Sequence, residues 1–346
     1  MFNYEWKLSD GYPKKNGLKC FGTFICGGGS SMGYKLAGID HLGGVEIDEK
    51  IAEIYKENHH PKYLYTMDIR DFVKKTDIPE ELYNIDILDG SPPCSTFSIA
   101  GSREDAWGKE KVFAEGQKLQ TLDDLFFIYL DLVNKLKPKV FVAENVSGLI
   151  KGNAKAYVKK IMNKADRIGY DIQLFLVNGV QCGLPQRRER CFFVGRRKDL
   201  NLPKLKLELK EQVIPFSQIK EKKYCKEGLE SISEYSLKLL ENCKYGIDKT
   251  YSDINERLYN KVSGFNEVIC YGNKVCPTIT ATKIPTYINR DKTEVRRLTR
   301  NEILKASSFP MDYKDNGKLH FLCGMSVPPI MTATIAEQIC KQIFNK

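Results

Sequence analysis

Short apolar runs alternate with amphipathic segments over the first two hundred of the 346 residues, and this alternation constrains the fold most strongly. A strand that is buried on both faces is a continuous apolar run, and a helix that connects two parallel strands carries one apolar face. The pattern therefore predicts an α/β domain with a parallel sheet and crossover helices. The predicted strands are Lys19–Cys26, Gly43–Ile47, Ile85–Asp89, Val140–Glu144, Ile172–Val177 and Cys191–Gly195.

Three segments have the residue spacing of helices. In the segment from Leu122 to Lys137, apolar residues recur every three or four positions; Thr121 offers an N-cap and Pro138 prevents continuation. Ala154–Ile168 is the second predicted helix. The third, Ile330–Phe344, is expected to pack back on the first domain.

The sequence changes character after Arg197. Residues 199–290 are richer in Lys, Glu, Asn and Tyr, and they show weak periodicity and no repeat. This change predicts a second, smaller and less regular domain. The predicted division is a catalytic domain over 1–198 and 322–346, a second domain over 199–300 and a hinge region over 301–321.

Composition is that of an ordinary soluble protein, with 42% hydrophobic and 28% charged residues. No apolar run is expected to reach the ~20 residues that a membrane helix needs, and the polar N-terminus lacks a signal-peptide core, so we expect a cytoplasmic protein. The net charge is +10, and residues 201–300 hold 19 Lys and Arg against 13 Asp and Glu. Either a solvated Lys-rich surface or a footprint for a phosphate backbone explains this excess.

The cysteines do not have the spacing of a metal or disulfide site. The chain has eleven cysteines and four histidines, but no CxxC pair. An odd number of cysteines in a chain that is neither small nor secreted favours reduced thiols. We therefore predict no metal site, and we expect most of the thiols to be buried as small apolar groups.

Acidic residues follow a glycine-rich run in the order that an adenosine-type cofactor needs. The run FICGGGSSMG (24–33) comes after the first predicted strand, where glycine lets backbone approach a ligand closely. Glu46 and Asp48 end the second strand, where doubly wound folds hold ribose hydroxyls. Asp68 could accept a hydrogen bond from an adenine amino group. Taken singly, each acid is better explained as a solvated loop residue, and it is their order that favours a cofactor site.

A cysteine follows the third of the predicted strands. The run DGSPPCSTFS (89–98) leads directly from Ile85–Asp89 into two prolines and Cys94. Because the prolines fix the backbone, they would hold Cys94 rigidly at the ligand edge of the sheet. A buried structural cysteine would more naturally lie within an apolar run. The position therefore favours a nucleophile.

Two further polar groups lie at strand ends. The run VFVAENV (140–146) brings Glu144 to the end of a strongly apolar strand, and QRRER (186–190) precedes Cys191–Gly195. Separately, a surface acid and a solvated basic patch explain them. Together with Cys94 they place a thiol, a carboxylate and a guanidinium at the edges of one sheet.

The order of these motifs is distinctive. A Gly-rich turn, Pro-Pro-Cys, Glu-Asn-Val and Gln-Arg-Arg-x-Arg are followed by RLTRNE (297–302), FP (309–310) and GMSVPP (324–329). In this order the chain resembles the DNA (cytosine-5-)-methyltransferase family of bacterial and phage type. The motifs leave out chiefly residues 199–290, where that family keeps its target-recognition region, and PTITA (277–281) resembles a turn near the end of that region.

The resemblance implies a fold and a reaction. The fold is the Rossmann-like class I S-adenosylmethionine-dependent methyltransferase fold, with a mostly parallel doubly wound sheet and a smaller irregular target-recognition domain. The reaction moves a methyl group from S-adenosylmethionine to C5 of a cytosine flipped out of a specific DNA sequence. Cys94 would add to C6, Glu144 would protonate or hydrogen-bond N3, and Arg190, helped by Arg188, would hold O2.

The resemblance also implies binding residues and partners. The cofactor contacts carried over are Phe24, Gly27, Gly28, Gly29, Glu46, Ile47, Asp68, Ile69, Pro92, Met325, Ser326 and Val327. The nucleic-acid contacts are Ser95, Phe97, Ser98, Arg188, Thr278 and Thr280. We expect double-stranded DNA as the partner, a monomer, and a cognate restriction endonuclease that would act separately. The segment Ile99–Leu119 resembles the mobile loop that closes on DNA.

Two residues depart from the family pattern in the cofactor motifs. Cys26 stands where the family usually has glycine, and Met325 stands where it usually has asparagine. Neutral drift and a reshaped cofactor pocket both explain these changes.

Other functions fit parts of the sequence. A tRNA cytosine-C5 methyltransferase shares these motifs, but the long basic region over 199–290 favours DNA. A DNA-binding homologue that is inactive or uses its cofactor differently is a second alternative, against which Cys94, Glu144 and Arg190 argue together. A nicotinamide dehydrogenase would not require Pro-Pro-Cys.

Overall fold

The structure is a computed structural model, and it describes residues 2–93, 124–150, 155–225, 229–261 and 267–346. The chain divides into two compact units. The large-sheet unit comprises Tyr12–Val177, Glu189–Glu208 and Thr332–Lys346, and the small-sheet unit comprises Met1–Gly11, Asn178–Arg188 and Leu209–Met331.

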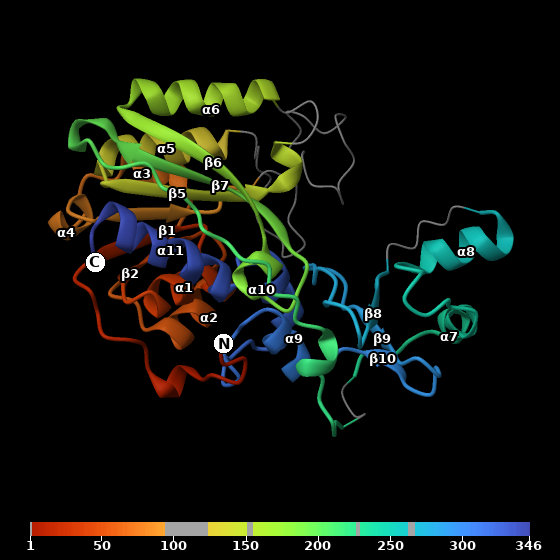
Figure 1. The fold of residues 1–346 in the computed structure, drawn as a ribbon. Helices are drawn as coiled ribbons and strands as arrows, with labels where there is room; N and C mark the ends of the chain where they lie inside the picture. The colour runs from red at the N-terminus through yellow and green to blue at the C-terminus, as the bar shows by residue number, and fades with distance from the viewer. Residues whose placement is uncertain (1, 94–123, 151–154, 226–228, 262–266) are drawn as a thin grey trace. The chain divides into compact units, whose positions relative to one another are not determined.

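A seven-stranded sheet forms the centre of the large-sheet unit (Figure 1). Its strand order is β3-β2-β1-β4-β5-β7-β6. The first five strands in this order pair in parallel, and β7 runs antiparallel to β5. The strands are β1 (Lys19–Thr23), β2 (Asp40–Glu46), β3 (Tyr63–Thr66), β4 (Ile87–Gly90), β5 (Val140–Val146), β6 (Tyr170–Asn178) and β7 (Glu189–Arg197).

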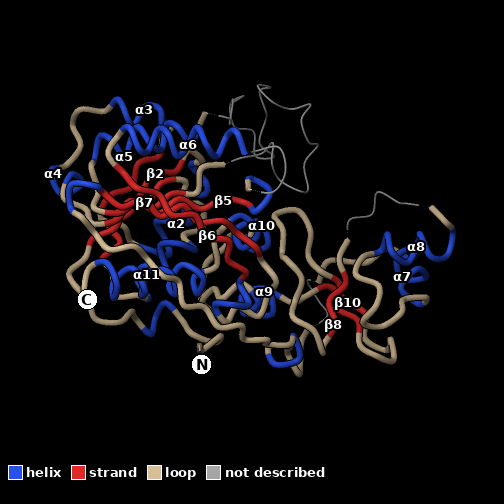
Figure 2. Tube along the Cα trace, turned by 45° about the horizontal axis from the view of Figure 1, so that its top comes forward, coloured by secondary structure: helices blue, strands red, loops and turns tan. Residues whose placement is uncertain are grey.

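Helices cover both faces of this sheet, as the tube in Figure 2 also shows. One face carries α3 (Ile69–Lys74), α5 (Leu125–Leu136) and α6 (Lys155–Arg167), and the other carries α1 (Gly29–Leu36), α2 (Glu49–His59) and α11 (Pro329–Ile343). The short helix α4 is Glu80–Tyr83, and single 3₁₀ turns span Ser147–Leu149 and Lys198–Leu200. The predicted mostly parallel, doubly wound sheet with crossover helices is therefore confirmed.

The core of this unit explains why the apolar runs form these elements. Phe21 of β1 and Leu88 of β4 are fully buried in one cluster with Phe126, Leu130 and Val133 of α5. These three helix positions follow steps of three and four residues, so they form one apolar face. The Tyr129 hydroxyl donates to the Leu88 carbonyl at 2.8 Å, which satisfies its polar group inside the core.

Most predicted elements of the large-sheet unit are found with shifted ends, and one strand of its sheet, β3, was not predicted. The strand β3 has only four residues and is partly buried, so it lacks the strong apolar run of the others. The first turn predicted for α5, with its Thr121 cap, and the predicted start of α6 at Ala154 lie outside the described residues.

The small-sheet unit contains a three-stranded sheet in the order β10-β9-β8. Its strands are β8 (Ile269–Tyr271), β9 (Thr286–Ile288) and β10 (Val295–Arg297), and its helices are α7 (Glu234–Glu241), α8 (Tyr251–Tyr259), α9 (Arg300–Ala306) and α10 (Leu319–Met325). Single 3₁₀ turns span Leu8–Asp10, Gly179–Cys182 and Phe216–Gln218. Residues of α7, α8, β8 and β9 share a small apolar core.

The division of the chain differs from the predicted one at 198, 300 and 322. Residues 178–188 belong to the small-sheet unit because their side chains bond within it. Gln186 is fully buried, donates to the Ala306 carbonyl at 3.1 Å and accepts from the Ile279 amide at 3.2 Å. The segment predicted as a hinge, 301–321, lies within the same unit. Such contacts join residues far apart in sequence, so no local pattern could have given these boundaries.

One stretch of the described chain, Leu319–Ile343, is long and apolar enough to cross a membrane by length and composition. It spans 25 residues, and 72% of its most apolar window is buried inside the protein. A buried helix of a protein core has these properties. The expectation that no apolar run reaches this length is therefore corrected for this stretch.

Candidate active site

The glycine-rich turn after β1 has an unusual backbone. Phe24, Cys26 and Gly28 have positive φ angles of 55°, 44° and 78°. At Gly28 a Cβ atom would lie 2.0 Å from Nε2 of His59, so the imidazole occupies the space that a side chain would need. The left-handed φ of Cys26 also explains why glycine suits this position in the family that the sequence resembles.

His59 supports this turn from α2, which the sequence analysis did not foresee. Its Nε2 lies 3.3 Å from the Gly27 carbonyl oxygen, and its ring stacks on Tyr55 with 4.3 Å between centroids. Burial lowers the pKa of His59 well below its usual value, so the imidazole is neutral. A neutral ring can both pack against glycine and hydrogen-bond a carbonyl.

Glu46, at the end of β2, joins the turn to the second strand. Its carboxylate accepts hydrogen bonds from the backbone amides of Cys26 at 2.9 Å, Ile47 at 2.9 Å and Asp48 at 3.0 Å. Burial raises the pKa of Glu46, and these three donors oppose that shift. A carboxylate has about four lone-pair sites, so one remains for a ligand hydroxyl. This donor set fits the ribose of an adenosine-type cofactor.

The residues predicted to hold adenine lie after β2 and β3. Asp68 caps α3 by accepting from the Arg70 amide at 2.8 Å, and its other oxygen pairs with the Arg70 guanidinium at 3.1 Å. Ile69 is buried in the core, whereas Ile47 is exposed. The contact of Asp68 with an adenine amino group stays a prediction.

Asn145 positions the turn that leads from β4 to the predicted nucleophile. It is 4% exposed, and its Nδ2 donates to the Pro92 carbonyl at 3.0 Å. Pro92 lies two residues before Cys94 in the sequence. Cys94 itself, with Ser95, Phe97 and Ser98, lies outside the described residues. Asn145 lies in the Glu-Asn-Val motif, but the sequence alone indicates no role for it.

Replacing Asn145 by alanine should lower kcat by about 10²-fold and leave cofactor affinity within about twofold, because a misplaced reacting group costs rate rather than binding. Single-turnover methyl transfer and calorimetric cofactor binding measure the two effects. Asn134→Ala is the matched control, since Asn134 lies on α5 and its side-chain oxygen accepts an exposed hydrogen bond from Lys137 just after the helix. Equal losses in both variants would contradict the role of Asn145.

Glu144 and Arg190 form an ion pair across β5 and β7. Antiparallel pairing sets Glu144 opposite Phe192 and Val146 opposite Arg190, so the two charged side chains are diagonal neighbours on one face. Arg190 Nε lies 2.8 Å from Glu144 Oε1, and both side chains are largely buried. The structure thus brings together two of the predicted catalytic residues.

A buried carboxylate lies at the end of β4, and the sequence analysis gave it no role. Asp89 Oδ1 accepts a hydrogen bond from the Tyr34 hydroxyl at 3.0 Å. Burial raises the pKa of Asp89 to about 7, and the nearby Glu144 charge adds to this shift. The hydrogen bonds from Tyr34 and Ser30 act in the opposite direction.

The raised pKa of Asp89 predicts a pH-dependent stability. Below about pH 4 the carboxyl is protonated both folded and unfolded, whereas above pH 7 the folded state must hold a buried charge. The unfolding free energy of the wild type relative to Asp89→Asn should therefore fall by up to about 4 kcal/mol between these limits. Urea unfolding of both proteins at several pH values measures this, and a difference that is constant with pH would contradict it.

The other predicted residues lie in the small-sheet unit. Arg188 is 1% exposed, and its guanidinium donates to the carbonyls of Ile279, Gly324 and Ser326 at 3.1, 2.7 and 2.8 Å. These contacts favour a packing role over the predicted contact with a base or with DNA. Ser326 and Val327 are buried, while Met325 is 48% exposed.

The PTITA turn packs closely against α10 within the same unit. Thr278 donates to the Arg187 carbonyl, and Thr280 accepts from the Lys283 amide at 3.2 Å. A Cβ at Gly324 would lie 2.3 Å from the Ala281 amide nitrogen, so only glycine fits there. Among the residues that the structure describes, no group of three or more His, Cys, Asp or Glu side chains could hold a metal ion.

Comparison with known proteins agrees with this arrangement. The family model of the C-5 cytosine-specific DNA methylase matches residues 18–341. The type II methyltransferase M.FnuDI of Fusobacterium nucleatum is 28% identical over 95% of this chain and 96% of its own length. M.NgoPII of Neisseria gonorrhoeae, another type II methyltransferase, is 34% identical over 54% of this chain and 50% of its own.

Among solved structures, a mutant of DNMT2 from Spodoptera frugiperda has the same fold, with a TM-score of 0.64 and 16% identity. The match covers 94% of this chain and 99% of that one. The family model spans most of the sequence. The chain therefore belongs to the C-5 cytosine-specific DNA methylase family and is a DNA (cytosine-5-)-methyltransferase.

Proposed function

We propose that this methyltransferase uses S-adenosylmethionine to methylate C5 of a cytosine that is flipped out of double-stranded DNA, through a covalent bond between Cys94 and C6. The observation that carries the proposal is the buried Glu144–Arg190 pair. It is joined by the hydrogen bond from Asn145 of β5 to Pro92, which precedes Cys94 by two residues in the sequence. A carboxylate and a guanidinium held together match the N3 and O2 edge of cytosine.

The residues of the chain account for each step on the base. Cytosine C5 is a weak nucleophile, so the Cys94 thiolate adds to C6 and turns the ring into an enamine with electron density at C5. Glu144 supports the addition by protonating or hydrogen-bonding N3, and Arg190 holds O2. After C5 has accepted the methyl group, its proton passes to a water molecule and the electrons of the C5–H bond re-form the C5–C6 double bond. The C6–S bond then breaks and releases Cys94 as the thiolate.

The cofactor fits the donors and acceptors at the end of the large sheet. When bound, S-adenosylmethionine supplies an electrophilic methyl group. Glu46 has a remaining acceptor site for a ribose hydroxyl, and the turn around Gly28 brings backbone close to the ligand. Asp68 and Ile69 would hold the adenine, and Phe24 with Gly27–Gly29 would hold the methionine end.

The partner is double-stranded DNA, and the protein acts as a monomer, because flipping one base needs no second subunit. The names of M.FnuDI and M.NgoPII as type II methyltransferases support a place beside a restriction endonuclease that acts separately. The Ile99–Leu119 segment, which lies outside the described residues, is proposed as the loop that closes on DNA.

Mass spectrometry of nucleosides tests this function. Unmethylated duplex DNA and unmodified tRNA are each incubated with the protein and S-adenosylmethionine and then digested. We expect 5-methylcytosine from the DNA and none from the tRNA. The reverse result would establish the RNA reaction, and no product from either substrate would favour a binding protein without this activity.

A further inference from the structure

The small-sheet unit contains a cavity that the reaction on cytosine does not use. Its volume is about 530 Å³, and it is lined by Tyr245, Asn273 and Arg290. These residues come from three separate loops: Tyr245 lies between α7 and α8, Asn273 follows β8 and Arg290 follows β9. An aromatic ring, an amide and a guanidinium therefore line one space.

Arg290 differs from the other arginines of this part of the chain. Every other arginine described between residues 209 and 331 is paired with a carboxylate: Arg257 with Asp248, Arg296 with Glu302, Arg297 with Glu267 and Arg300 with Asp315. Among the described residues, the Arg290 side chain has no hydrogen bond or ion pair, and neither has the Asn273 side chain or the Tyr245 hydroxyl. These donors and acceptors are available to a ligand.

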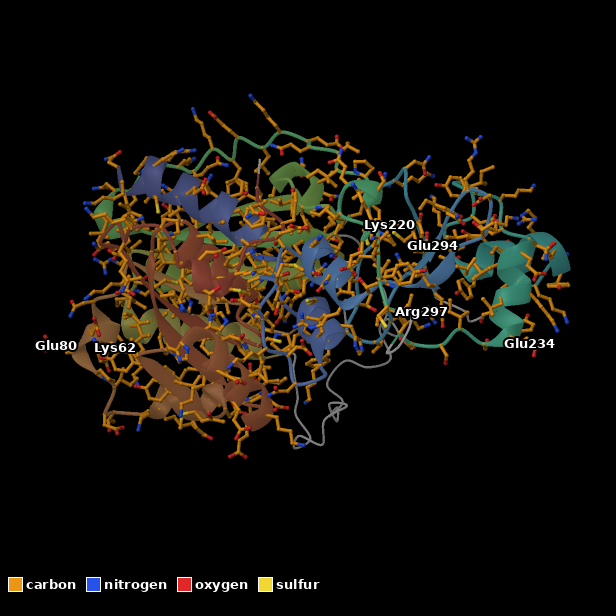
Figure 3. All side chains as sticks on the ribbon, turned by 90° about the horizontal axis from the view of Figure 1, so that it is seen from below. Lys62, Glu80, Lys220, Glu234, Glu294 and Arg297 are labelled. Carbon is orange, nitrogen blue, oxygen red and sulfur yellow. The ribbon has the colours of Figure 1, made fainter. Side chains whose placement is uncertain are left out.

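The loop that carries Arg290 is held by its own hydrogen bonds. The Asn289 side chain accepts from the Glu294 amide at 2.8 Å and donates to Thr293 Oγ1 at 2.9 Å. At the end of the loop, Glu294 pairs with Lys220 at 2.7 Å and with Arg296 at 2.9 Å. Figure 3 labels Glu294 and Lys220. The backbone that presents Arg290 is thus fixed, although its side chain is exposed.

The other two lining residues are also supported from behind. Asn273 lies in a turn closed by the Lys274 amide, which donates to the Tyr271 carbonyl at 3.1 Å. The Tyr245 ring packs edge-on against Tyr271, with 4.8 Å between centroids. The held backbones keep the three groups at one place, so this arrangement suits recognition rather than loose surface charge.

The chemistry of the three groups identifies the ligand. A phosphate offers only acceptors, so an amide with both donors and an acceptor gains nothing specific from it. Base edges in the major groove offer both, and the pairings that fit best are arginine with O6 and N7 of guanine and asparagine with N6 and N7 of adenine.

We propose that Arg290 and Asn273 determine the target sequence by reading a guanine and a neighbouring adenine. This inference rests on the proposed function for its partner, double-stranded DNA. Tyr245 lines the same space beside these two side chains. Arg290 and Asn273 determine which sequence is bound and take no part in the chemistry at cytosine.

Selection of duplexes from a random pool by binding tests this inference without depending on methyl transfer. The full-length wild type is compared with Arg290→Lys, Arg290→Ala, Asn273→Ala and the control Lys238→Ala. The Lys238 cation lies on α7 and pairs with Glu234 at 2.7 Å. Arg290→Lys keeps the charge but removes the planar fork, so it should lose preference for guanine at one position by roughly 10- to 100-fold. Asn273→Ala should reduce the preference for adenine at the adjacent position of the motif. The control should select the same motif as the wild type.

The outcomes separate this inference from the proposed function. If Arg290→Lys and Asn273→Ala select the wild-type motif, the two residues do not read bases. The same conclusion follows if Arg290→Ala weakens binding to all sequences alike while Arg290→Lys binds them as tightly as the wild type. A wild type that selects no motif also overturns the inference. A wild type that selects a guanine-containing motif, lost in Arg290→Lys, but forms no 5-methylcytosine supports the inference and refutes the proposed function.

Discussion

Replacing Cys94 by alanine is expected to abolish the formation of 5-methylcytosine, with a loss of roughly 10⁴- to 10⁶-fold. The reason is chemical: without a thiolate on C6, cytosine C5 has too little electron density to attack a methyl group. Binding of DNA and cofactor should remain, since the thiol contributes to the covalent step. Nucleoside mass spectrometry measures the product, and gel shift with labelled duplex measures binding.

A second readout reports the covalent bond directly. A duplex with 5-fluorocytosine at the target position cannot lose the C5 substituent as a proton, so the adduct should persist on a denaturing gel for the wild type and be missing for Cys94→Ala. Cys225→Ala is the matched control, because Cys225 is a free and exposed thiol. An adduct that survives in Cys94→Ala and disappears in Cys225→Ala would show that Cys225, and not Cys94, is the nucleophile.

The centre of the large sheet was predictable because its inner strands, such as β1, β4 and β5, are buried on both faces. Residues such as Phe141 and Val142 are buried together in β5, which gives an uninterrupted run that sequence reveals directly. The edge strand β3 has partly buried residues and no such run, so it was missed. The small sheet has strands of three residues each, which are too short for any periodicity.

The residue types of the candidate site could be predicted from the sequence, but the residues that hold them in place could not. Motif spacing pointed to Glu144 and Arg190, and the diagonal register of β5 and β7 explains why they meet. The roles of Asn145 and His59 depend on contacts with residues 53 and 32 positions away, which no local pattern contains. Arg188 resembled a site residue in the sequence, but its three carbonyl partners lie about a hundred positions further along the chain.

Replacing Glu144 by glutamine should lower kcat by roughly 10²- to 10⁴-fold, the range for loss of a positioned acid. Glutamine keeps the size of the side chain and can still hydrogen-bond, but it cannot transfer a proton to N3. Cofactor affinity should stay within about twofold. Asp131→Asn is the matched control, since that carboxylate pairs with Lys164 at 2.7 Å on the helical face. Pre-steady-state methyl transfer and calorimetry separate the two quantities.

Glu144 and Arg190 should also act as a unit, because each holds the other in place at 2.8 Å. Residues that cooperate in one step give losses that are not additive. We therefore expect the double variant Glu144→Gln/Arg190→Gln to be hardly slower than the worse single variant. Removing one partner also leaves the other with a poorly solvated charge or dipole, so thermal unfolding should show the single variants to be no more stable than the double one. Rate losses that multiply in the double variant would mean that the carboxylate and the guanidinium act on separate steps.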